Sequence, residues 1–357
     1  MTLSRNPFTS QRMKRFVYIS RNYKHPDCGG GIARTDIESI MEQMGYINIG
    51  HPHSVSHNGL VHSLRNITGI FKAISRLRQG DTLVIQYQQK MFDRICRAAH
   101  RKGAKVICII HDLDSFRNKI LTPEQEIPLL NGADVLLTHN HRMRRWLTDH
   151  GCTTPMVDYE IMDYIHGTSG EPHPMPADGN FSLYFVGNLS SELNDWIYQL
   201  AEIMPSRHIY LYGSELNTDK ATTLPNLHPM GTVTDTEIIR RHQGDFGISW
   251  YGLSLTEGIG KVGEYMNYNN PHKVGLYLRC NSPVIVWSHA GRAEFIIREQ
   301  IGIAVDSLLQ LDKALSTITP EDYRRMIDCV KHINHKLKTG RYLRDALTQA
   351  IDIIYRS

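Results

Sequence analysis

The stretch "HGTSGEPHPMPADGN" (166–180) lies between two series of alternating apolar and amphipathic segments. It contains three prolines and three glycines among polar residues, a composition typical of a linker rather than of a helix or strand. A chain of 357 residues is also longer than one hydrophobic core usually serves. We therefore expect two domains, over residues 14–165 and 181–335, joined by a linker at 166–180.

Apolar runs rich in β-branched residues predict the strands. In the first half they lie at 15–20, 82–87, 105–110 and 134–139; in the second half they lie at 181–187, 208–213, 226–231, 245–250, 283–287 and 302–305. The amphipathic stretches of the first half lie at 31–44, 64–79, 91–102, 123–131 and 140–150, and residues 320–355 have a helical pattern throughout. Buried strands that alternate with helices predict a doubly wound α/β fold in each half. Two such domains form a cleft at the carboxyl ends of their strands, where we expect the functional residues.

The composition excludes several classes of protein. No apolar run reaches the roughly 18 residues of a membrane span, and residues 1–13 read as a disordered leader without the apolar core of a signal peptide. The six cysteines are scattered without a C-x-x-C pair, which indicates reduced thiols and a cytoplasmic protein. The net charge of +4 and the absence of a recognition motif argue against a nucleic-acid partner.

The charge is uneven along the chain. Residues 1–165 hold 22 Lys and Arg against 15 Asp and Glu, whereas the remainder holds 18 against 21. A basic first half suggests an anionic partner, although chance asymmetry is an alternative. The helical patterns at 64–78 and 139–151 carry several arginines beside apolar residues, and together they would form a surface suited to anionic lipid headgroups. Ordinary amphipathic helices packed on a sheet are the alternative.

The stretch "GEYMNYNNPHKVGLYL" (263–278) concentrates polar residues at the start of a helix. Asn270 fits the N-cap and Pro271 the first helical position. The positive charge of Lys273 is unfavourable at the positive end of the helix dipole unless an anion binds there. The free backbone N–H groups of the first turn, together with this lysine, would hold a diphosphate. His272 lies beside it, and Glu264, Asn267 and Asn269 would reach sugar hydroxyls. The alternative is a capped core helix with a solvated lysine.

Glycines follow two predicted strands of the second half. Gly187 precedes Asn188 in "FVGNLS", and Gly213 follows Tyr212 in "YLYGS". A glycine at a strand end lets a ligand approach the backbone. The pattern is consistent with a nucleotide cleft, although such glycines are also common in plain turns.

The first half offers two polar loops after strands. In "RNYKHPDCGGGIARTD" (21–36), His25, Asp27, Gly29 and Gly30 precede or open a helix and would contact an acceptor or a phosphate; a plain turn is the alternative. In "IIHDLDSFR" (109–117), Asp112 and Asp114 follow a buried strand. Two carboxylates at this spacing can chelate a cation, but we favour one of them as an acceptor-orienting residue or general base. His111 is equally consistent with a structural role.

These residues together carry a resemblance. The chain resembles bacterial galactofuranosyltransferases of surface-polysaccharide synthesis, above all the O-antigen β-1,6-galactofuranosyltransferases. The stretches that carry this resemblance are "GEYMNYNNPHKVGLYL", "FVGNLS", "FGISWYG", "HDLDSFR" and "ADVLLTHNHRMRRWL". More distantly the chain is similar to the glucosyltransferases of serine-rich adhesins. Those carry an arginine where this chain has Leu189-Ser190-Ser191, which puts the adhesin substrate in doubt.

The resemblance implies a GT-B fold, with two Rossmann-like domains and a last helix (336–357) that crosses back to the first domain. It implies a UDP-sugar donor, no metal cofactor, and a sugar acceptor on an undecaprenyl-diphosphate-linked glycan at the inner membrane. The residues that it implies for donor contact are Gly187, Asn188, Tyr212, Asn269, His272 and Lys273, and Asp112 and Asp114 would face the acceptor. The E-x7-E pair of many retaining GT-B enzymes is absent, with Leu276 at its second position, which fits inversion.

The hypothesis is an inverting galactofuranosyltransferase. Asp112 or Asp114 would act as base, with Asp27 and His25 as reserves, and Lys273 would stabilise the departing UDP. A hexosyltransferase that uses UDP-glucose or UDP-galactose is one alternative, and a non-catalytic nucleotide-sugar-binding subunit is another. A homo-oligomer is compatible with the sequence, which does not determine the oligomeric state.

Overall fold

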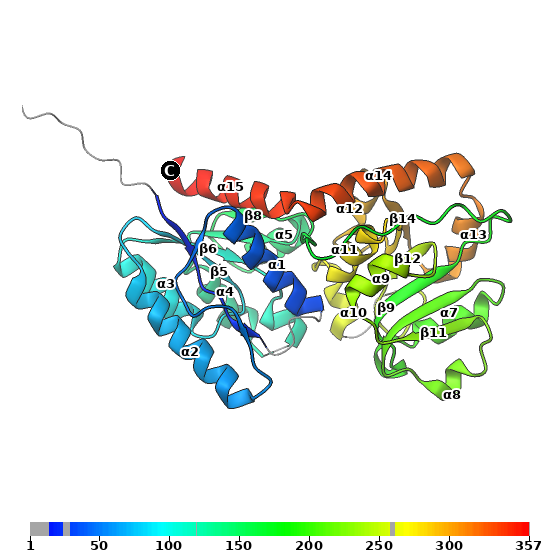
Figure 1. Ribbon diagram of the computed structural model, residues 1–357, viewed down its shortest axis with the longest axis horizontal. Helices are drawn as coiled ribbons and strands as arrows, with labels where there is room; N and C mark the ends of the chain where they lie inside the picture. The colour runs from blue at the N-terminus through cyan, green and yellow to red at the C-terminus, as the bar shows by residue number, and fades with distance from the viewer. Residues whose placement is uncertain (1–13, 24–28, 119, 258–260, 357) are drawn as a thin grey trace, which may run out of the picture.

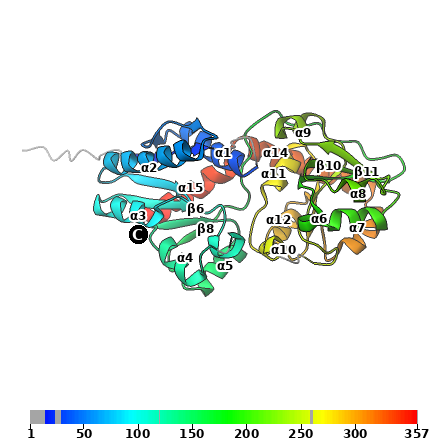
Figure 2. The same cartoon turned by 90° about the horizontal axis from the view of Figure 1, so that it is seen from below.

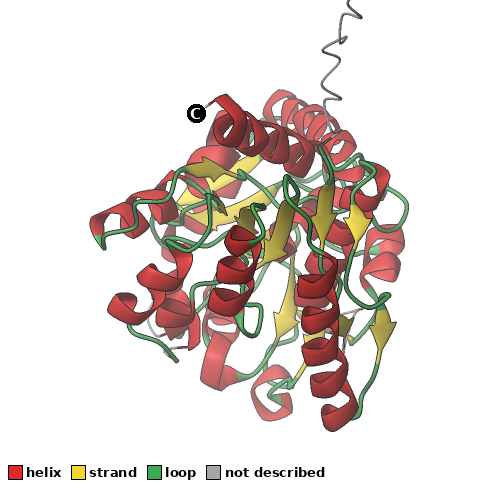
Figure 3. Ribbon diagram, turned by 90° about the vertical axis from the view of Figure 1, so that its left-hand side faces the viewer, coloured by secondary structure: helices red, strands yellow, loops and turns green. Residues whose placement is uncertain are grey.

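Two parallel β-sheets of six strands, one from each half of the chain, organise the structure (Figure 1). The computed structural model describes residues 14–23, 29–118, 120–257 and 261–356. Helices flank the strands of both sheets (Figure 3). The predicted pair of doubly wound α/β domains is therefore confirmed.

The N-terminal sheet has the order β3-β1-β5-β6-β7-β8, with every pairing parallel. Its strands are β1 (Phe16–Tyr18), β3 (Ile47–Asn48), β5 (Thr82–Gln86), β6 (Lys105–Ile109), β7 (Val135–Thr138) and β8 (Met156–Asp158). Its helices are α1 (Gly29–Gln43), α2 (Gly59–Arg76), α3 (Phe92–Arg101), α4 (Pro123–Leu130) and α5 (His141–Asp149). The strands β5 and β7 are buried along their whole length, as their apolar sequences predict.

Four short strands are not predicted from the sequence. The strands β2 (Asn22–Tyr23) and β4 (Ser54–Val55) form a separate parallel pair, while β3 and β8 lie at the two edges of the main sheet. Each is only two or three residues long. Such segments are too short to show a periodic pattern, so their pairing depends on the fold around them.

The C-terminal sheet has the order β11-β10-β9-β12-β13-β14, again with parallel pairings. Its strands are β9 (Leu183–Asn188), β10 (Ile209–Ser214), β11 (Leu227–Gly231), β12 (Phe246–Ser249), β13 (Val284–Trp287) and β14 (Gly302–Val305). The helices are α6 (Ser191–Asn194), α7 (Trp196–Ile203), α8 (Thr218–Ala221), α9 (Asp235–Arg241), α10 (Lys261–Tyr265), α11 (His272–Arg279), α12 (Ala293–Arg298) and α13 (Leu311–Ser316).

The last two helices run along one side of both domains (Figure 1). Helix α14 (Pro320–Lys338) begins at a capping box made by Thr319 and Asp322 and belongs to the second domain. Helix α15 (Arg341–Arg356) returns to the first domain and packs on β7 and β8. Gly340 adopts a left-handed φ of 67° between them, so the helical pattern predicted over residues 320–355 is divided into two helices.

The apolar face of α15 completes the core of the first domain. Leu343 and Leu347 are fully buried in a cluster with Tyr18, Ile107 and Leu137 of the N-terminal sheet. Burial of a leucine side chain contributes roughly 2 kcal/mol, so the helix is a structural part of this domain.

The described cysteines agree with the expected reduced state, since all five are free thiols and Cys28 lies outside the described residues. None of the described helices combines the length and the apolar character that a bilayer span requires. The leader expected at 1–13 also lies outside the described residues.

Candidate functional site

A cavity of about 330 Å³ lies between the two domains. Its walls come from α1, the carboxyl end of β9, the segments that follow β6, β7, β8 and β12, the start of α9, and residues 265–276. The carboxyl ends of both sheets therefore meet around it, which is where doubly wound folds bind ligands. Its acidic and basic lining residues are Arg34, Asp112, Arg117, Asp235 and Lys273.

Lys273 projects into this cavity from the first turn of α11. Its Nζ atom lies 3.8 Å from the centroid of the Phe185 ring and 4.1 Å from that of Tyr251. Burial lowers the pKa of its ammonium well below the usual value, and no acidic group of the described residues offsets this effect. A cation held by aromatic faces, with no carboxylate of the described residues paired to it, is suited to receive an anion.

Gly187 provides the space that Lys273 occupies. It is the penultimate residue of β9 and has a φ of 151°, and a Cβ atom there would lie 3.3 Å from the lysine Nζ. Gly213 has a different reason to be glycine, because a Cβ there would lie 1.7 Å from the Gly187 carbonyl oxygen on the neighbouring strand. Gly187 therefore shapes the cavity, whereas Gly213 permits the strands to pair.

Three buried polar atoms of cavity-lining residues have no hydrogen-bond partner. They are Nε2 of His139, Oδ1 of Asn269 and Nε2 of His272. Burial lowers the pKa of His139 to about 3 and that of His272 to about 4, so both imidazoles are neutral. More than 90% of buried polar groups in proteins are paired, so these three atoms around one cavity are available to hydrogen-bond a ligand.

The segment before α11 belongs to the second half of the chain but packs on the first domain. Tyr265 is part of the N-terminal core, and its hydroxyl accepts a hydrogen bond of 3.1 Å from the Leu113 backbone N–H. Tyr268 packs near Phe116, with 4.8 Å between the ring centroids. Residues 265–271 therefore connect the two domains beside the cavity.

Asn270 is part of this connection and does not cap α11, which corrects the prediction. The helix begins at His272, and Pro271 occupies the cap position without a side-chain bond. The Asn270 amide instead donates to the backbone oxygens of His139 and Glu160. The sequence suggested a local cap because Asn is a frequent N-cap residue, but its side chain instead forms these two hydrogen bonds with the first domain.

Asp112 lines the cavity, whereas Asp114 does not. Arg117 donates a hydrogen bond of 2.5 Å to Asp112 Oδ2, and burial raises the pKa of this carboxyl while Arg117 opposes the rise. The carboxylate of Asp114 accepts instead from the Gln88 side chain at 2.5 Å, in the π-helical turn Asp114–Asn118. The two residues of the D-x-D pair therefore face different neighbours. No group of three metal-ligating side chains occurs among the described residues.

His111 also lines the cavity, where its imidazole is hydrogen-bonded to Gln86 and uncharged. Its Nε2 atom lies 2.7 Å from the side-chain oxygen of Gln86. Burial and the nearby arginines lower the pKa of His111 well below its usual value. The imidazole is therefore neutral.

Several predicted donor-binding residues do not line the cavity. Asn188 bonds to Glu215 and to the Ser190 N–H, and Asn267 bonds within its own turn to the Glu264 oxygen. The hydroxyl of Tyr212 is buried and accepts from the Gln243 N–H at 2.7 Å. The predicted residues outside the cavity lining are Asp114, Asn188, Tyr212, Gly213, Glu264 and Asn267. Gly29 and Gly30 open α1 as expected, and His25 and Asp27 lie outside the described residues.

Sequence reasoning missed six polar or aromatic lining residues. They are Arg34, Arg117, His139, Asp235, Tyr251 and Tyr265. Arg117 and His139 follow the strands β6 and β7, so they could have been predicted from the tendency of ligands to bind at loops that follow parallel strands. Arg34 lies within α1 and Tyr265 within α10, where nothing local distinguishes them from ordinary helix residues.

The two basic helices do not form one surface, contrary to expectation. Helix α2 packs on α3 and β2, whereas α5 packs on β7 and β8, and the two lie apart in the first domain (Figure 2). Two arginines of α5 are also engaged: Arg142 bonds to the His289 oxygen and Arg144 pairs with Asp158.

Family models match both halves of the chain. The model of the N-terminal domain of glucosyltransferase 3-like proteins matches residues 16–161, and that of the C-terminal domain matches residues 183–350. The chain is 28% identical over 320 residues to the β-1,6-galactofuranosyltransferase WbbI of Escherichia coli, covering 89% of this chain and 92% of that one. It is 24% identical over 334 residues to glucosyltransferase 3 of Streptococcus gordonii, covering 90% and 93%.

Solved structures share the architecture. The trehalose-6-phosphate protein of E. coli, bound with UDP-2-fluoro glucose, superposes with a TM-score of 0.58 at 12% identity, covering 94% of this chain and 99% of that one. A protein of Anabaena in complex with UDP and glucose superposes with a TM-score of 0.55 at 12% identity, covering 96% and 100%. The fold is GT-B, as predicted.

Proposed function

Since the chain belongs to the glucosyltransferase 3-like family and is a glycosyltransferase, we propose that it transfers galactofuranose from UDP-galactofuranose to a sugar acceptor, with inversion and without a metal cofactor. The transfer would serve the synthesis of a cell-surface polysaccharide. The identity to an E. coli galactofuranosyltransferase over most of both chains supports this donor. The match to a glucosyltransferase makes UDP-glucose the second candidate.

One observation carries the proposal: Lys273 lies at the start of α11 against the rings of Phe185 and Tyr251 inside the interdomain cavity, and no carboxylate of the described residues pairs with it. A nucleoside diphosphate is the ligand whose charge fits this position, because the helix N-terminus and the ammonium both favour an anion. Asn269 and His272 would supply hydrogen bonds to the nucleotide or its sugar. Two proteins of like fold are bound with UDP or a UDP-sugar, which supports a nucleotide of this kind as the ligand.

The reaction would proceed by direct displacement. Asp112 would accept the proton of an acceptor hydroxyl, and the hydroxyl oxygen would form a bond to the anomeric carbon of the donor. The bond from that carbon to the diphosphate oxygen would break, and its electron pair would leave with UDP. Lys273 and the N–H groups of the first turn of α11 would stabilise the charge that develops on the diphosphate, which is the task of a metal ion in other transferases.

The acceptor that we propose is a glycan linked to undecaprenyl diphosphate, and α2 would carry the peripheral membrane contact. Three apolar side chains are exposed along one stripe of this helix: Leu60 at 84%, Leu64 at 63% and Phe71 at 56%. Arg65 and Lys72 flank the stripe. Apolar residues beside cations on one helix face are typical of helices that lie in a lipid interface.

The experiment that tests the function is UDP release by the purified protein across a panel of UDP-sugars, with and without EDTA. We expect the highest rate with UDP-galactofuranose and no loss in EDTA. A higher rate with UDP-glucose or UDP-galactose would show that the donor is that sugar nucleotide and not UDP-galactofuranose. Loss of activity in EDTA would show that the enzyme requires a metal ion. Binding of UDP without turnover of any donor would overturn the enzymatic proposal in favour of a binding subunit.

A further inference from the structure

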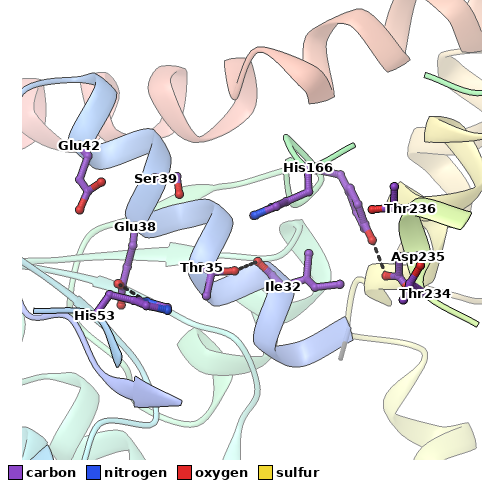
Figure 4. A pocket seen from close by; sticks show the side chains of 11 residues that line it. Ile32, Thr35, Glu38, Ser39, Glu42, His53, His166, Thr234, Asp235 and Thr236 are labelled. Atoms are coloured by element: carbon purple, nitrogen blue, oxygen red, sulfur yellow. Dashed lines mark hydrogen bonds and ion pairs between the residues drawn. The ribbon is translucent and has the colours of Figure 1, made fainter. Parts of the chain in front are cut away.

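A second and larger cavity, of about 510 Å³, opens between the domains beside the first (Figure 4). One side is a face of α1, from Ile32 to Glu42. The other side is the first turn of α9, and the imidazole of His166 lies between them, whereas that of His53 lies beside Glu38 at the end away from α9 (Figure 4). Its volume lies within the range of about 300–1,000 Å³ that is typical of small-molecule sites.

The two cavities share a wall. Asp235 lines both, and it accepts a hydrogen bond from the hydroxyl of Tyr164. The Tyr164 ring in turn stacks on His272, with 4.8 Å between the centroids, and His272 lines the first cavity. Along α1, Ala33 and Arg34 line the first cavity while Ile32 and Thr35 line the second. A molecule held in one cavity is therefore adjacent to a molecule held in the other.

The two cavities differ in charge. Three basic residues line the first cavity, whereas none of the lysines and arginines described in the structure lines the second. The second cavity contains the carboxylates of Glu38, Glu42 and Asp235. Carboxylates disfavour a diphosphate or another anion, so we expect the phosphates of a nucleotide in the first cavity rather than in this one.

The remaining lining groups suit a polyhydroxyl ligand. The hydroxyl-bearing side chains of the cavity are Thr35, Ser39, Tyr164, Thr234 and Thr236. Glu42 accepts from the Tyr18 hydroxyl through Oε1, and Asp235 accepts from Tyr164 through Oδ2. Within the described part of the chain, the second oxygen of each carboxylate has no hydrogen bond from the protein. Carboxylate oxygens accept readily from ligand hydroxyls, and the Ser39 hydroxyl offers both a donor and an acceptor.

We propose that this second cavity is an acceptor subsite, which binds an uncharged sugar residue adjoining the sugar that receives the transferred group. The inference rests on the proposed glycosyltransfer in the first cavity. It defines the acceptor as an oligosaccharide with a neutral residue next to its acceptor sugar. A monosaccharide would leave the second cavity unused.

The test introduces a bulky side chain into the second cavity from α1. Ser39 points into it between Thr35 and Glu42 (Figure 4), so Ser39→Phe would occupy the space of the second sugar. The matched control is Ser75→Phe, at an exposed serine on α2. Transfer from the donor selected by the UDP-sugar panel is measured onto methyl β-galactoside and onto methyl β-lactoside. We expect Ser39→Phe to raise the KM for the disaccharide about tenfold, a loss of roughly 1.4 kcal/mol, and to leave the monosaccharide KM and the donor KM unchanged.

Direct binding separates this proposal from the proposed function. Saturation-transfer NMR on the full-length protein compares methyl β-lactoside, methyl β-galactoside and a disaccharide with a uronic acid as its second residue. We expect the neutral disaccharide to bind most tightly and to lose this advantage in Ser39→Phe but not in Ser75→Phe. Equal binding of all three probes, or equal loss in both variants, would overturn the subsite. Failure of every donor to turn over would overturn the enzyme and leave this binding result standing.

Discussion

The side chain of Asn140 donates a hydrogen bond of 2.9 Å to the side-chain oxygen of Asn270, across the boundary between the two domains. Asn140 also donates to the Tyr268 carbonyl oxygen at 2.9 Å, and its own oxygen caps α5. The Asn270 N–H donates to Nδ1 of His139 at 2.9 Å. These contacts hold the start of α11, and therefore Lys273, in a fixed position relative to the first domain.

Asn270→Ala should destabilise the protein more than substitution of a neighbouring asparagine. The change removes three side-chain hydrogen bonds, to Asn140, His139 and Glu160, of which the first two are buried, so we expect the free energy of unfolding to fall by about 3 kcal/mol. Urea-induced unfolding measures the difference. The control is Asn267→Ala, whose amide bonds to the Glu264 oxygen in its own turn and to no other residue that the structure describes. Equal losses in the two variants would show that the domain contact adds nothing.

Lys273→Ala should reduce sugar transfer strongly while leaving the fold intact. Loss of one group that stabilises developing charge typically costs about 10²–10³-fold in rate. UDP release at saturating donor measures this effect, with circular dichroism as the check on folding. Lys313→Ala, at an exposed lysine of the same domain, is the control and should keep full activity. A Lys273→Ala enzyme within about twofold of the native rate would remove the leaving-group role.

Asp112→Asn should reduce transfer by at least about 100-fold, as expected for loss of a general base. The physical reason is that Asp112 lines the cavity, whereas the carboxylate of Asp114 is turned toward Gln88. Asp114→Asn is therefore the matched control and should lose less than about tenfold. Steady-state transfer rates at saturating acceptor distinguish the two. If Asp114→Asn were the more damaging change, or if neither mattered, the proton acceptor would be another group, and Asp235 would be the next carboxylate to test.

Acidification should destabilise the protein through His139. Burial lowers the pKa of this imidazole in the folded protein from 6.5 to about 3. Below pH 6.5 the unfolded chain therefore binds a proton that the folded protein does not, and stability falls as the pH drops toward 3. Between pH 7 and pH 5 this group alone should cost about 2 kcal/mol.

Urea unfolding of the native protein and of His139→Gln at the two pH values measures that contribution. The variant cannot titrate at this position, so its loss of stability on acidification should be smaller by the same amount. Parallel pH profiles for the two proteins would contradict the neutral, buried state of His139.

The sequence predicts the strands of this fold well because parallel strands buried on both faces are continuous apolar runs. It also singles out Lys273, because a cation in the first turn of a helix opposes the helix dipole and calls for an explanation. Asp112 is found by its place after a buried strand. These signals are local, and each depends on only a few neighbouring residues.

The rest of the site depends on contacts between distant parts of the chain. Asn140 and Asn270 are 130 positions apart, and Leu113 and Tyr265 are 152 positions apart. No local pattern shows that the segment before α11 packs on the other domain. For the same reason Asn270 resembled a cap, and the two carboxylates of the D-x-D pair could not be told apart until the positions of Gln88 and Arg117 were known.

The return of α15 to the first domain has a consequence for biosynthesis. The sheet that it covers is made early by the ribosome, but the leucines that seal its core, Leu343 and Leu347, emerge only after the whole second domain. Until then the nascent first domain has an open apolar face. The two domains therefore cannot mature one after the other, and a chain truncated before α15 would expose this face to chaperones and proteases rather than yield a smaller stable protein.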